Sequence, residues 1–121
     1  MARFLVVFRP RDTAAPQDLI AALDPVVSGM TAEVENRTTV HLSAMLRDAS
    51  DNLRLQLFAD VQARSVGPVL ELVLMSREPM GRGAPLTREC FTRLVELTGQ
   101  NLPDLEVVFR SDRDGPLPDL R

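Results

Sequence analysis

The feature that most constrains the fold is a nearly unbroken apolar run near the middle of the chain, at residues 69–75. The run is shorter than the roughly 20 apolar residues of a membrane-spanning helix, and branched residues dominate it, so it predicts an interior β-strand. Side chains alternate between the two faces of a strand. One face of this strand is then all leucine and must be covered, whereas the other is mixed and carries Val69, Glu71, Val73 and Met75.

Two kinds of periodicity divide the rest of the chain. Alternating apolar residues predict further strands at residues 4–8, 38–46, 53–61 and 105–110. Apolar residues at helical spacing predict two helices, within residues 13–29 and 87–99. Asp24-Pro25 leaves two readings open, because it either stops the first helix or divides it into two parts. Residues 31–34 form either a short strand or an extended lead-in.

The predicted order is strand, helix, three strands, helix, strand. Two helices of this kind cover one face of a mainly antiparallel sheet of about five strands, so the expected fold is a two-layer α+β sandwich, a variant of the ferredoxin-like order. In the last strand we expect Leu105, Val107 and Phe109 to face the helices, and Thr87 to be the N-cap of the second helix. A chain of 121 residues predicts one domain, residues 1–111, followed by a flexible C-terminal tail, residues 112–121.

Composition excludes some classes of function. The net charge is −3, and neither Trp nor Tyr is present, so a nucleic-acid surface of cations and stacking aromatic rings is not expected. A mildly acidic chain fits a basic partner better. Before Arg9 the chain has five consecutive apolar residues, fewer than the roughly seven to fifteen of a secretory signal. With no bilayer-spanning run, we expect a cytoplasmic protein that does not bind membranes.

Three sequence features could carry chemistry, but none predicts a catalytic or cofactor site. The single histidine rules out a multi-histidine metal site, and no carboxylate spacing matches a calcium loop or a two-metal centre. Cys90 near a helix start could be an activated thiol, but a small core residue is the favoured reading. Gly81-Arg82-Gly83 lacks the further motif residues of a dinucleotide or phosphate loop and is read as a flexible connector. We therefore expect no metal, no cofactor and no catalytic residues.

If both helices cover one side of the sheet, the other side combines apolar residues with arginines, one glutamate and the histidine. Protein interfaces are enriched in Arg, Met and aromatic residues, and contiguous exposed apolar patches usually mark partners. The alternative is that the tail or residues 79–85 fold over this side. The residues expected to contact a partner are His41, Met45, Arg54, Phe58, Glu71, Val73, Met75, Arg77 and Arg110, with Leu5, Val7 and Val108 on the same side.

The carboxylate in the apolar run has two readings. A raised pKa would suit Glu71 to acid–base catalysis, but pairing with Arg54, Arg77 or Arg110 on the same face is favoured, because a buried carboxylate needs a partner. His41 is similarly read as a surface or interface residue rather than a catalytic base.

The leading hypothesis is a non-catalytic protein-binding domain. Its most concrete form is an immunity or inhibitor protein that sequesters a basic bacterial toxin or enzyme by occluding it. The alternative is a small enzyme or ligand-binding protein of the dimeric α+β barrel type, with a cavity near His41 and Glu71. A third hypothesis is a self-associating homodimer without a pocket.

Overall fold

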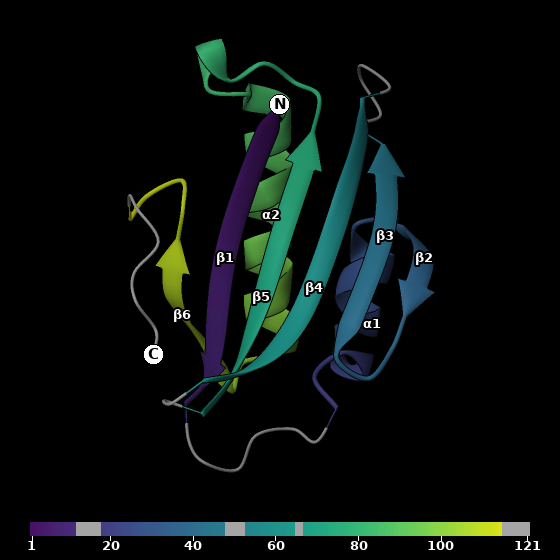
Figure 1. The fold of residues 1–121 in the computed structure, drawn as a ribbon, viewed down its shortest axis with the longest axis vertical. Coiled ribbons are helices and arrows are strands. Elements are labelled where there is room, and N and C mark those ends of the chain that lie inside the picture. The colour runs from purple at the N-terminus through teal and green to yellow at the C-terminus, as the bar shows by residue number, and fades with distance from the viewer. Residues whose placement is uncertain (12–17, 48–52, 65–66, 115–121) are drawn as a thin grey trace.

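A computed structural model describes residues 1–11, 18–47, 53–64 and 67–114 of the chain. In these residues six strands form one antiparallel sheet in the order β2-β3-β4-β5-β1-β6 (Figure 1). The strands are β1 (Ala2–Pro10), β2 (Glu33–Arg37), β3 (His41–Arg47), β4 (Arg54–Arg64), β5 (Gly67–Ser76) and β6 (Leu105–Arg110). The helices are α1 (Asp24–Gly29) and α2 (Pro85–Asn101), with short 3-10 turns η1 (Ala21–Leu23) and η2 (Met80–Arg82).

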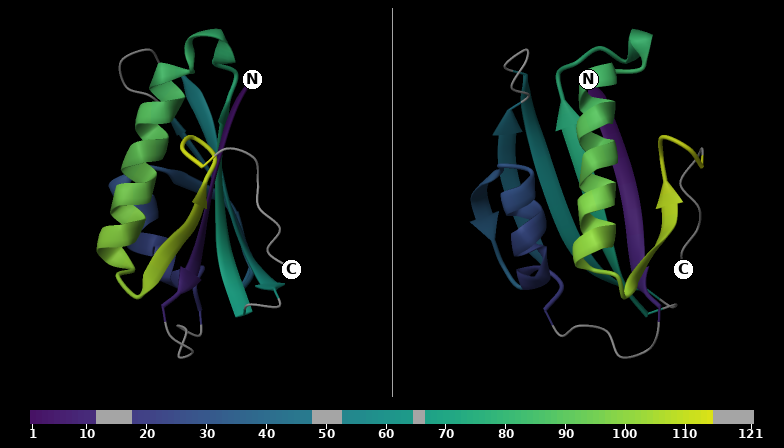
Figure 2. Two further views of the ribbon diagram at one scale, coloured as in Figure 1. Left: turned by 90° about the vertical axis from the view of Figure 1, so that its left-hand side faces the viewer. Right: turned by 180° about the vertical axis from the view of Figure 1, so that it is seen from behind.

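Both helices lie on the same side of the sheet, which is clearest when the sheet is seen edge-on (Figure 2). The main core lies between these layers. The three leucines of β5 have at most 1% of their surface exposed, and Phe4 of β1 stacks on Phe91 of α2 with ring centroids 5.3 Å apart. The predicted α+β class, with an antiparallel sheet and two helices, is confirmed. The side chains of β3, β4 and β5 that were predicted to face the core also do so.

The predicted number of strands was wrong, because residues 33–37 form a sixth strand. β2 has all five residues exposed and lacks apolar alternation, so its sequence carried little strand signal. It pairs with β3 through a register shift at Glu35, between Val34 and Asn36. Such a bulge bends the strand and interrupts the ladder locally. β2 therefore forms an exposed, irregular edge of the sheet.

The first predicted helix is shorter than its periodicity suggested. Residues 12–17, part of that prediction, lie outside the described residues. Within the described part, the 3-10 turn η1 leads directly into α1 at Asp24, with Pro25 in the first turn of α1. Proline suits this position, because the first amides of a helix have no intrahelical acceptor. The two-part reading of Asp24-Pro25 is therefore correct, and the Asp24 carboxylate pairs with Arg37 at 2.9 Å.

A β-bulge in β6 reverses two of the predicted side-chain directions. Phe8 is opposite Val107 and Val7 is opposite Phe109, so Val108 is an extra residue in the ladder. Phe109 therefore points away from the helices, contrary to our expectation, whereas Val107 packs against the main core as predicted. Simple alternation cannot reveal an inserted residue, because the bulge shifts the phase of everything that follows it.

The same bulge moves Arg110 to the helix side, which corrects its predicted place on the partner-binding side. Its Cζ atom lies 5.6 Å from the centroid of the Phe91 ring. The guanidinium also donates two hydrogen bonds to Asp112, at 3.1 and 2.9 Å. Residues 112–114, at the start of the predicted tail, form a turn in which the Asp114 amide donates to the Arg110 carbonyl. The rest of the predicted tail, residues 115–121, lies outside the described residues.

The start of α2 is capped from outside the helix, not by Thr87. The helix begins at Pro85, after Ala84 in a left-handed conformation that offers no side-chain cap. The carboxylate of buried Glu78 instead accepts hydrogen bonds from the backbone amides of Leu86 and Thr87 and from the Thr87 hydroxyl, at 3.1, 2.7 and 2.7 Å. The Thr87 hydroxyl also contacts Ser76 Oγ at 2.6 Å. This network joins the end of β5 to the first turn of α2 and so helps fix the helix over the sheet.

Candidate protein-binding face

The side of the sheet away from the helices divides into a closed part and an accessible part. Over β1 and β6, Leu5, Val7, Val69 and Phe109 form a second apolar cluster in which each is at most 7% exposed. Leu5 and Val7, expected to contact a partner, are thus on the predicted side but buried. Val108 packs against this cluster. The accessible part is formed by the outward side chains of β3, β4 and β5, and we call it the open face.

The loop that could have covered this face lies elsewhere. Residues 79–85 include η2, which lies beyond the end of the sheet, near the first turn of α2 (Figure 1). That loop, read as a flexible connector, contains a hydrogen-bonded turn in which the Gly83 amide donates to the Met80 carbonyl at 2.8 Å. The other expected cover was the tail, and its residues 115–121 lie outside the described residues.

Strand register arranges the open face in rows that run across β3, β4 and β5. Opposite residues of neighbouring strands lie side by side on the same face. Three rows follow directly from the ladder: His41–Asp60–Glu71, then Ser43–Phe58–Val73, then Met45–Gln56–Met75. A fourth row begins with the pair Arg47–Arg54 and continues in the same register to Arg77, which follows the end of β5. Successive rows are two residues apart, or about 7 Å.

The first row carries the negative charge of the open face, and we call it the acidic row: His41, Asp60 and Glu71. His41 Nδ1 lies 2.7 Å from Asp60 Oδ1, and Gln62 donates to Glu71 Oε2 at 2.9 Å. Asp60 was not among the predicted contact residues. The alternation of apolar and polar residues in β4 predicted that Asp60 points outward. Only the register between strands shows that it lies between His41 and Glu71.

The fourth row is wholly basic, and we call it the arginine row: Arg47, Arg54 and Arg77. These residues lie three rows, or about 20 Å, from the acidic row. Arg54 and Arg77, two of the three arginines expected to pair with Glu71, are therefore too far from it to do so. The third, Arg110, lies on the helix side of the sheet. Arg54 instead approaches Glu35 of β2 at 3.8 Å.

Between the charged rows lies an apolar centre, which we define as Met45, Phe58, Val73 and Met75. All four side chains are half-buried. A hollow of about 690 Å³ opens beside it, and Phe58, Met75, Arg54 and Arg77 line its wall together with Gln56, Ser76, Leu53 and Met1. Eight of the nine predicted contact residues therefore share the open face, and Arg110 does not.

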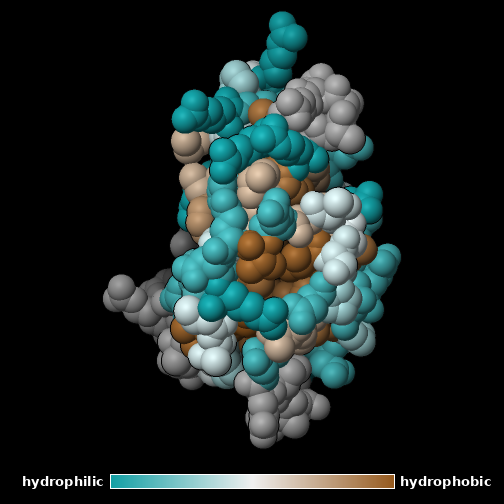
Figure 3. All heavy atoms as spheres, turned by 90° about the vertical axis from the view of Figure 1, so that its right-hand side faces the viewer, coloured by the Kyte–Doolittle hydropathy of each residue, from teal (hydrophilic) through white to brown (hydrophobic). Residues whose placement is uncertain are grey.

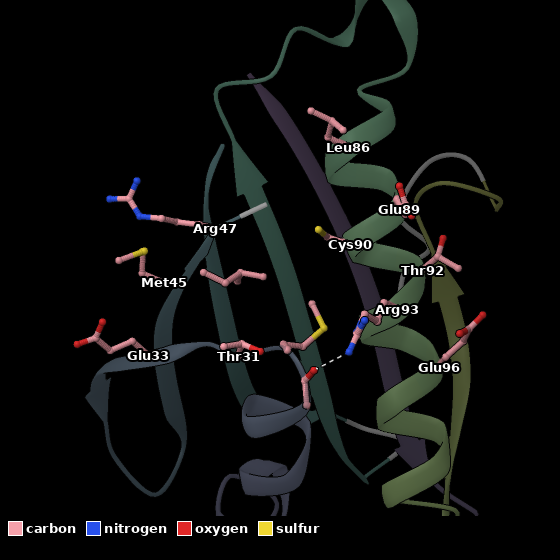
Figure 4. Close-up of a pocket in the computed structure, with 13 residues that line it drawn as sticks. Thr31, Glu33, Met45, Arg47, Leu86, Glu89, Cys90, Thr92, Arg93 and Glu96 are labelled. Carbon is pink, nitrogen blue, oxygen red and sulfur yellow. Dashed lines mark hydrogen bonds between the residues drawn. The ribbon is translucent and has the colours of Figure 1, made fainter. Parts of the chain in front are cut away.

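A second hollow, which sequence reasoning missed, lies on the helix side. It has a volume of about 910 Å³ and runs between α2, β3 and the segment after α1. Leu86 and Cys90 point from α2 toward this groove, and Arg93 donates to the Gly29 carbonyl at 2.9 Å across it (Figure 4). From the β2 edge of the molecule, apolar atoms are visible near the centre of the surface with polar residues around them (Figure 3).

The groove does not assemble a thiol catalyst. Cys90 lies in the second turn of α2, not at its start, so the amide groups of the first turn are not directed at its sulfur. His41, the chain's single histidine, is on the opposite side of the sheet. A thiol–imidazole pair therefore cannot form within one chain.

Two further kinds of feature are absent from the residues that the structure describes. None of their helices combines the length and apolar character that crossing a bilayer requires. They contain no cluster of three or more His, Cys, Asp or Glu side chains arranged to hold a metal ion.

Comparison with known proteins gave no match to any protein-family model and none to a curated protein.

Proposed function

We propose that this chain is a non-catalytic protein-binding domain that contacts its partner through the open face. The observation that carries the proposal is an apolar centre bordered by two rows of opposite charge. Apolar and aromatic anchors within a charged rim are the usual anatomy of a protein interface. The closed cluster over β1 and β6 limits this surface to β3, β4, β5 and the start of β1, where exposed Arg3 lies opposite Met75.

The surroundings of the ionisable residues support binding over catalysis. The side chains of His41 and Asp60 remain 31% and 42% exposed, on a strand row and not in an enclosed cavity. Catalytic acids and bases usually work in sites that exclude water, where electrostatic interactions are strengthened. An exposed imidazole–carboxylate pair suits recognition of a charged partner better.

The most concrete form of this function is an inhibitor or immunity-type protein in the cytoplasm. The apolar centre would cover a partner's surface, and Phe58 would be its main anchor. The acidic row would attract a basic toxin or enzyme and raise the rate of encounter. The mechanism would be steric occlusion of the partner's own site.

We further propose that the fold is a variant of the ferredoxin-like arrangement. The neighbour order β4-β5-β1-β6 is the order in which that arrangement places its second, third, first and fourth strands, and α1 and α2 follow its first and third strands. The β2–β3 hairpin is then an insertion after α1. This insertion supports the binding function, because β3 adds a third strand's side chains to the open face.

A specific contact favours a second candidate function, a small enzyme or ligand-binding protein of the dimeric α+β barrel type. The 2.7 Å contact of His41 with Asp60 could orient the imidazole as an acid or base, next to Glu71. Packing of two open faces would enclose these groups. Under this reading His41→Asn would abolish an activity, whereas under the protein-binding reading it would only weaken an affinity.

The test uses tagged protein expressed in its source cells, as wild type and as two variants. Phe58→Asp places a charge in the apolar centre, and Met80→Asp makes the same change at a 47% exposed methionine outside the open face. We expect a stoichiometric partner with wild type and Met80→Asp but not with Phe58→Asp. Equal recovery with Phe58→Asp, or no stoichiometric protein with wild type, would refute the proposal. Circular dichroism checks that both variants fold.

A further inference from the structure

The two charged rows of the open face are complementary to each other, and they lie at opposite ends of it. The arginine row presents three guanidinium groups, and the acidic row presents the carboxylates of Asp60 and Glu71. Each row by itself would attract any protein of opposite charge. The two rows lie at a fixed spacing on either side of an apolar centre. Together they are complementary to a surface that carries the same two rows in reverse order.

We infer that the partner bound by the open face is a second copy of this chain, packed face to face with its strands antiparallel to those of the first. This inference rests on the proposed protein-binding function, because it uses the same face, and it replaces a basic toxin or enzyme with a second copy as the occupant of that face. The two-fold axis lies between the two sheets, perpendicular to the strands, and passes between the Phe58 row and the Met75 row.

The register predicts which side chains meet. A rotation about this axis keeps each strand above its own copy but reverses the order of the rows. Arg54 then lies over Asp60 of the second copy, because both are on β4, and Arg77 lies over Glu71, because both belong to β5 or its end. The packing distance of two sheets is about 10 Å, which long arginine side chains can bridge. Two-fold symmetry makes every such contact twice.

The size of the face predicts the strength of association. Three strands about 4.8 Å apart and four rows over about 20 Å give a footprint of roughly 15 by 20 Å. This is smaller than the roughly 800 Å² per partner of a standard interface. We therefore expect a reversible dimer with a Kd in the micromolar range, and we expect that Kd to rise with salt concentration because exposed charge pairs are screened.

Charge reversal provides a sharp test by sedimentation equilibrium. One double variant, Arg54→Glu with Arg77→Glu, makes the arginine row acidic. The other, Asp60→Arg with Glu71→Arg, makes the acidic row basic. Each variant alone brings like charges together, and we expect its Kd to rise at least about 100-fold.

Mixing the two variants tests the symmetry. In an equimolar mixture position 54 again meets position 60, and position 77 again meets position 71, with opposite charges, so we expect a mixed dimer within about tenfold of the wild-type Kd. This rescue also shows that both variants are folded. The matched control, Glu89→Arg with Glu96→Arg on the exposed side of α2, adds the same charge as the second variant and should leave the Kd unchanged.

Three results would overturn the inference: wild type that remains monomeric up to about 500 μM, far above the expected micromolar Kd; a dimer that neither variant weakens; or folded variants that do not associate when mixed. A monomeric wild type whose Phe58→Asp variant still loses a different stoichiometric partner would refute the second-copy inference while leaving the proposed function intact. A monomeric wild type with no partner at all would refute both.

Discussion

Removal of the Glu78 carboxylate should destabilise the protein more than any change to an exposed glutamate. The carboxylate accepts hydrogen bonds from two backbone amides at the start of α2 and from the Thr87 hydroxyl, and its residue is only 9% exposed. A hydrogen bond to a charged group contributes about 1.5–3 kcal/mol, and the loss of a helix cap costs about 1 kcal/mol. Because these contributions overlap, Glu78→Ala should lower the free energy of unfolding by about 3–4 kcal/mol.

Glu78→Gln should have about half that effect, or about 2 kcal/mol, because the amide keeps one acceptor oxygen but presents an NH₂ group to donors. Thr87→Val removes the hydroxyl that joins Glu78 to Ser76. The double variant should therefore be less damaging than the sum of the two single changes, with a coupling of about 1–2 kcal/mol.

Urea denaturation measures these values. For a chain of this size we expect Glu78→Ala to lower the midpoint by about 1–2 M with little change in slope. Glu89→Gln, at an exposed position on the same helix, is the matched control and should stay within about 0.5 kcal/mol of wild type. A Glu78→Gln effect as small as the control, or a coupling near zero, would refute the capping role derived for this carboxylate.

Three further predictions test the fold. Deleting Val108 removes the bulge but leaves Val107 opposite Phe8 and Phe109 opposite Val7, so both side chains keep their present directions. We therefore expect the deletion to cost no more than about 1 kcal/mol in a urea melt; a cost of about 3 kcal/mol or more would contradict the assigned register. Leu72→Ala, in the centre of the sheet at 1% exposure, should cost about 3 kcal/mol by the same assay, and a cost below about 1 kcal/mol would place that leucine outside the core. The pKa of the Asp114 carboxyl lies below its ordinary 3.8, because the Arg113 side chain and a backbone amide donate hydrogen bonds to it. Its stabilising contribution is therefore present above the unfolded pKa and is lost as the pH falls through the folded pKa; a carboxyl NMR titration midpoint at or above 3.8 would disagree.

Alternation of apolar residues was sufficient to predict the inward faces of β3, β4 and β5. It works there because each of these strands keeps one face against the core without interruption, so the pattern in sequence is the pattern in space. The same rule failed in β6, where Val108 shifts the phase by one residue. A run of adjacent valines gives no local sign of which one is inserted.

Two further features depend on long-range structure and could not be read from the sequence. The acidic row requires the relative register of three strands, and this register brings Asp60 between His41 and Glu71. The cap of α2 comes from Glu78, seven residues before the helix begins, whereas sequence rules look for a cap at the residue next to the helix. Both are consequences of tertiary packing and not of local preference.

The bulged edge strand β2 determines how this molecule can grow into larger assemblies. An exposed strand is a template for lateral pairing, which in a protein that also associates through its sheet would allow unlimited polymerisation. The interruption at Glu35 and the charged residues of β2 oppose such pairing. Under the proposed pairing of open faces, association would then be limited to closed pairs, and replacing the charged residues of β2 with valines should convert these pairs into fibres.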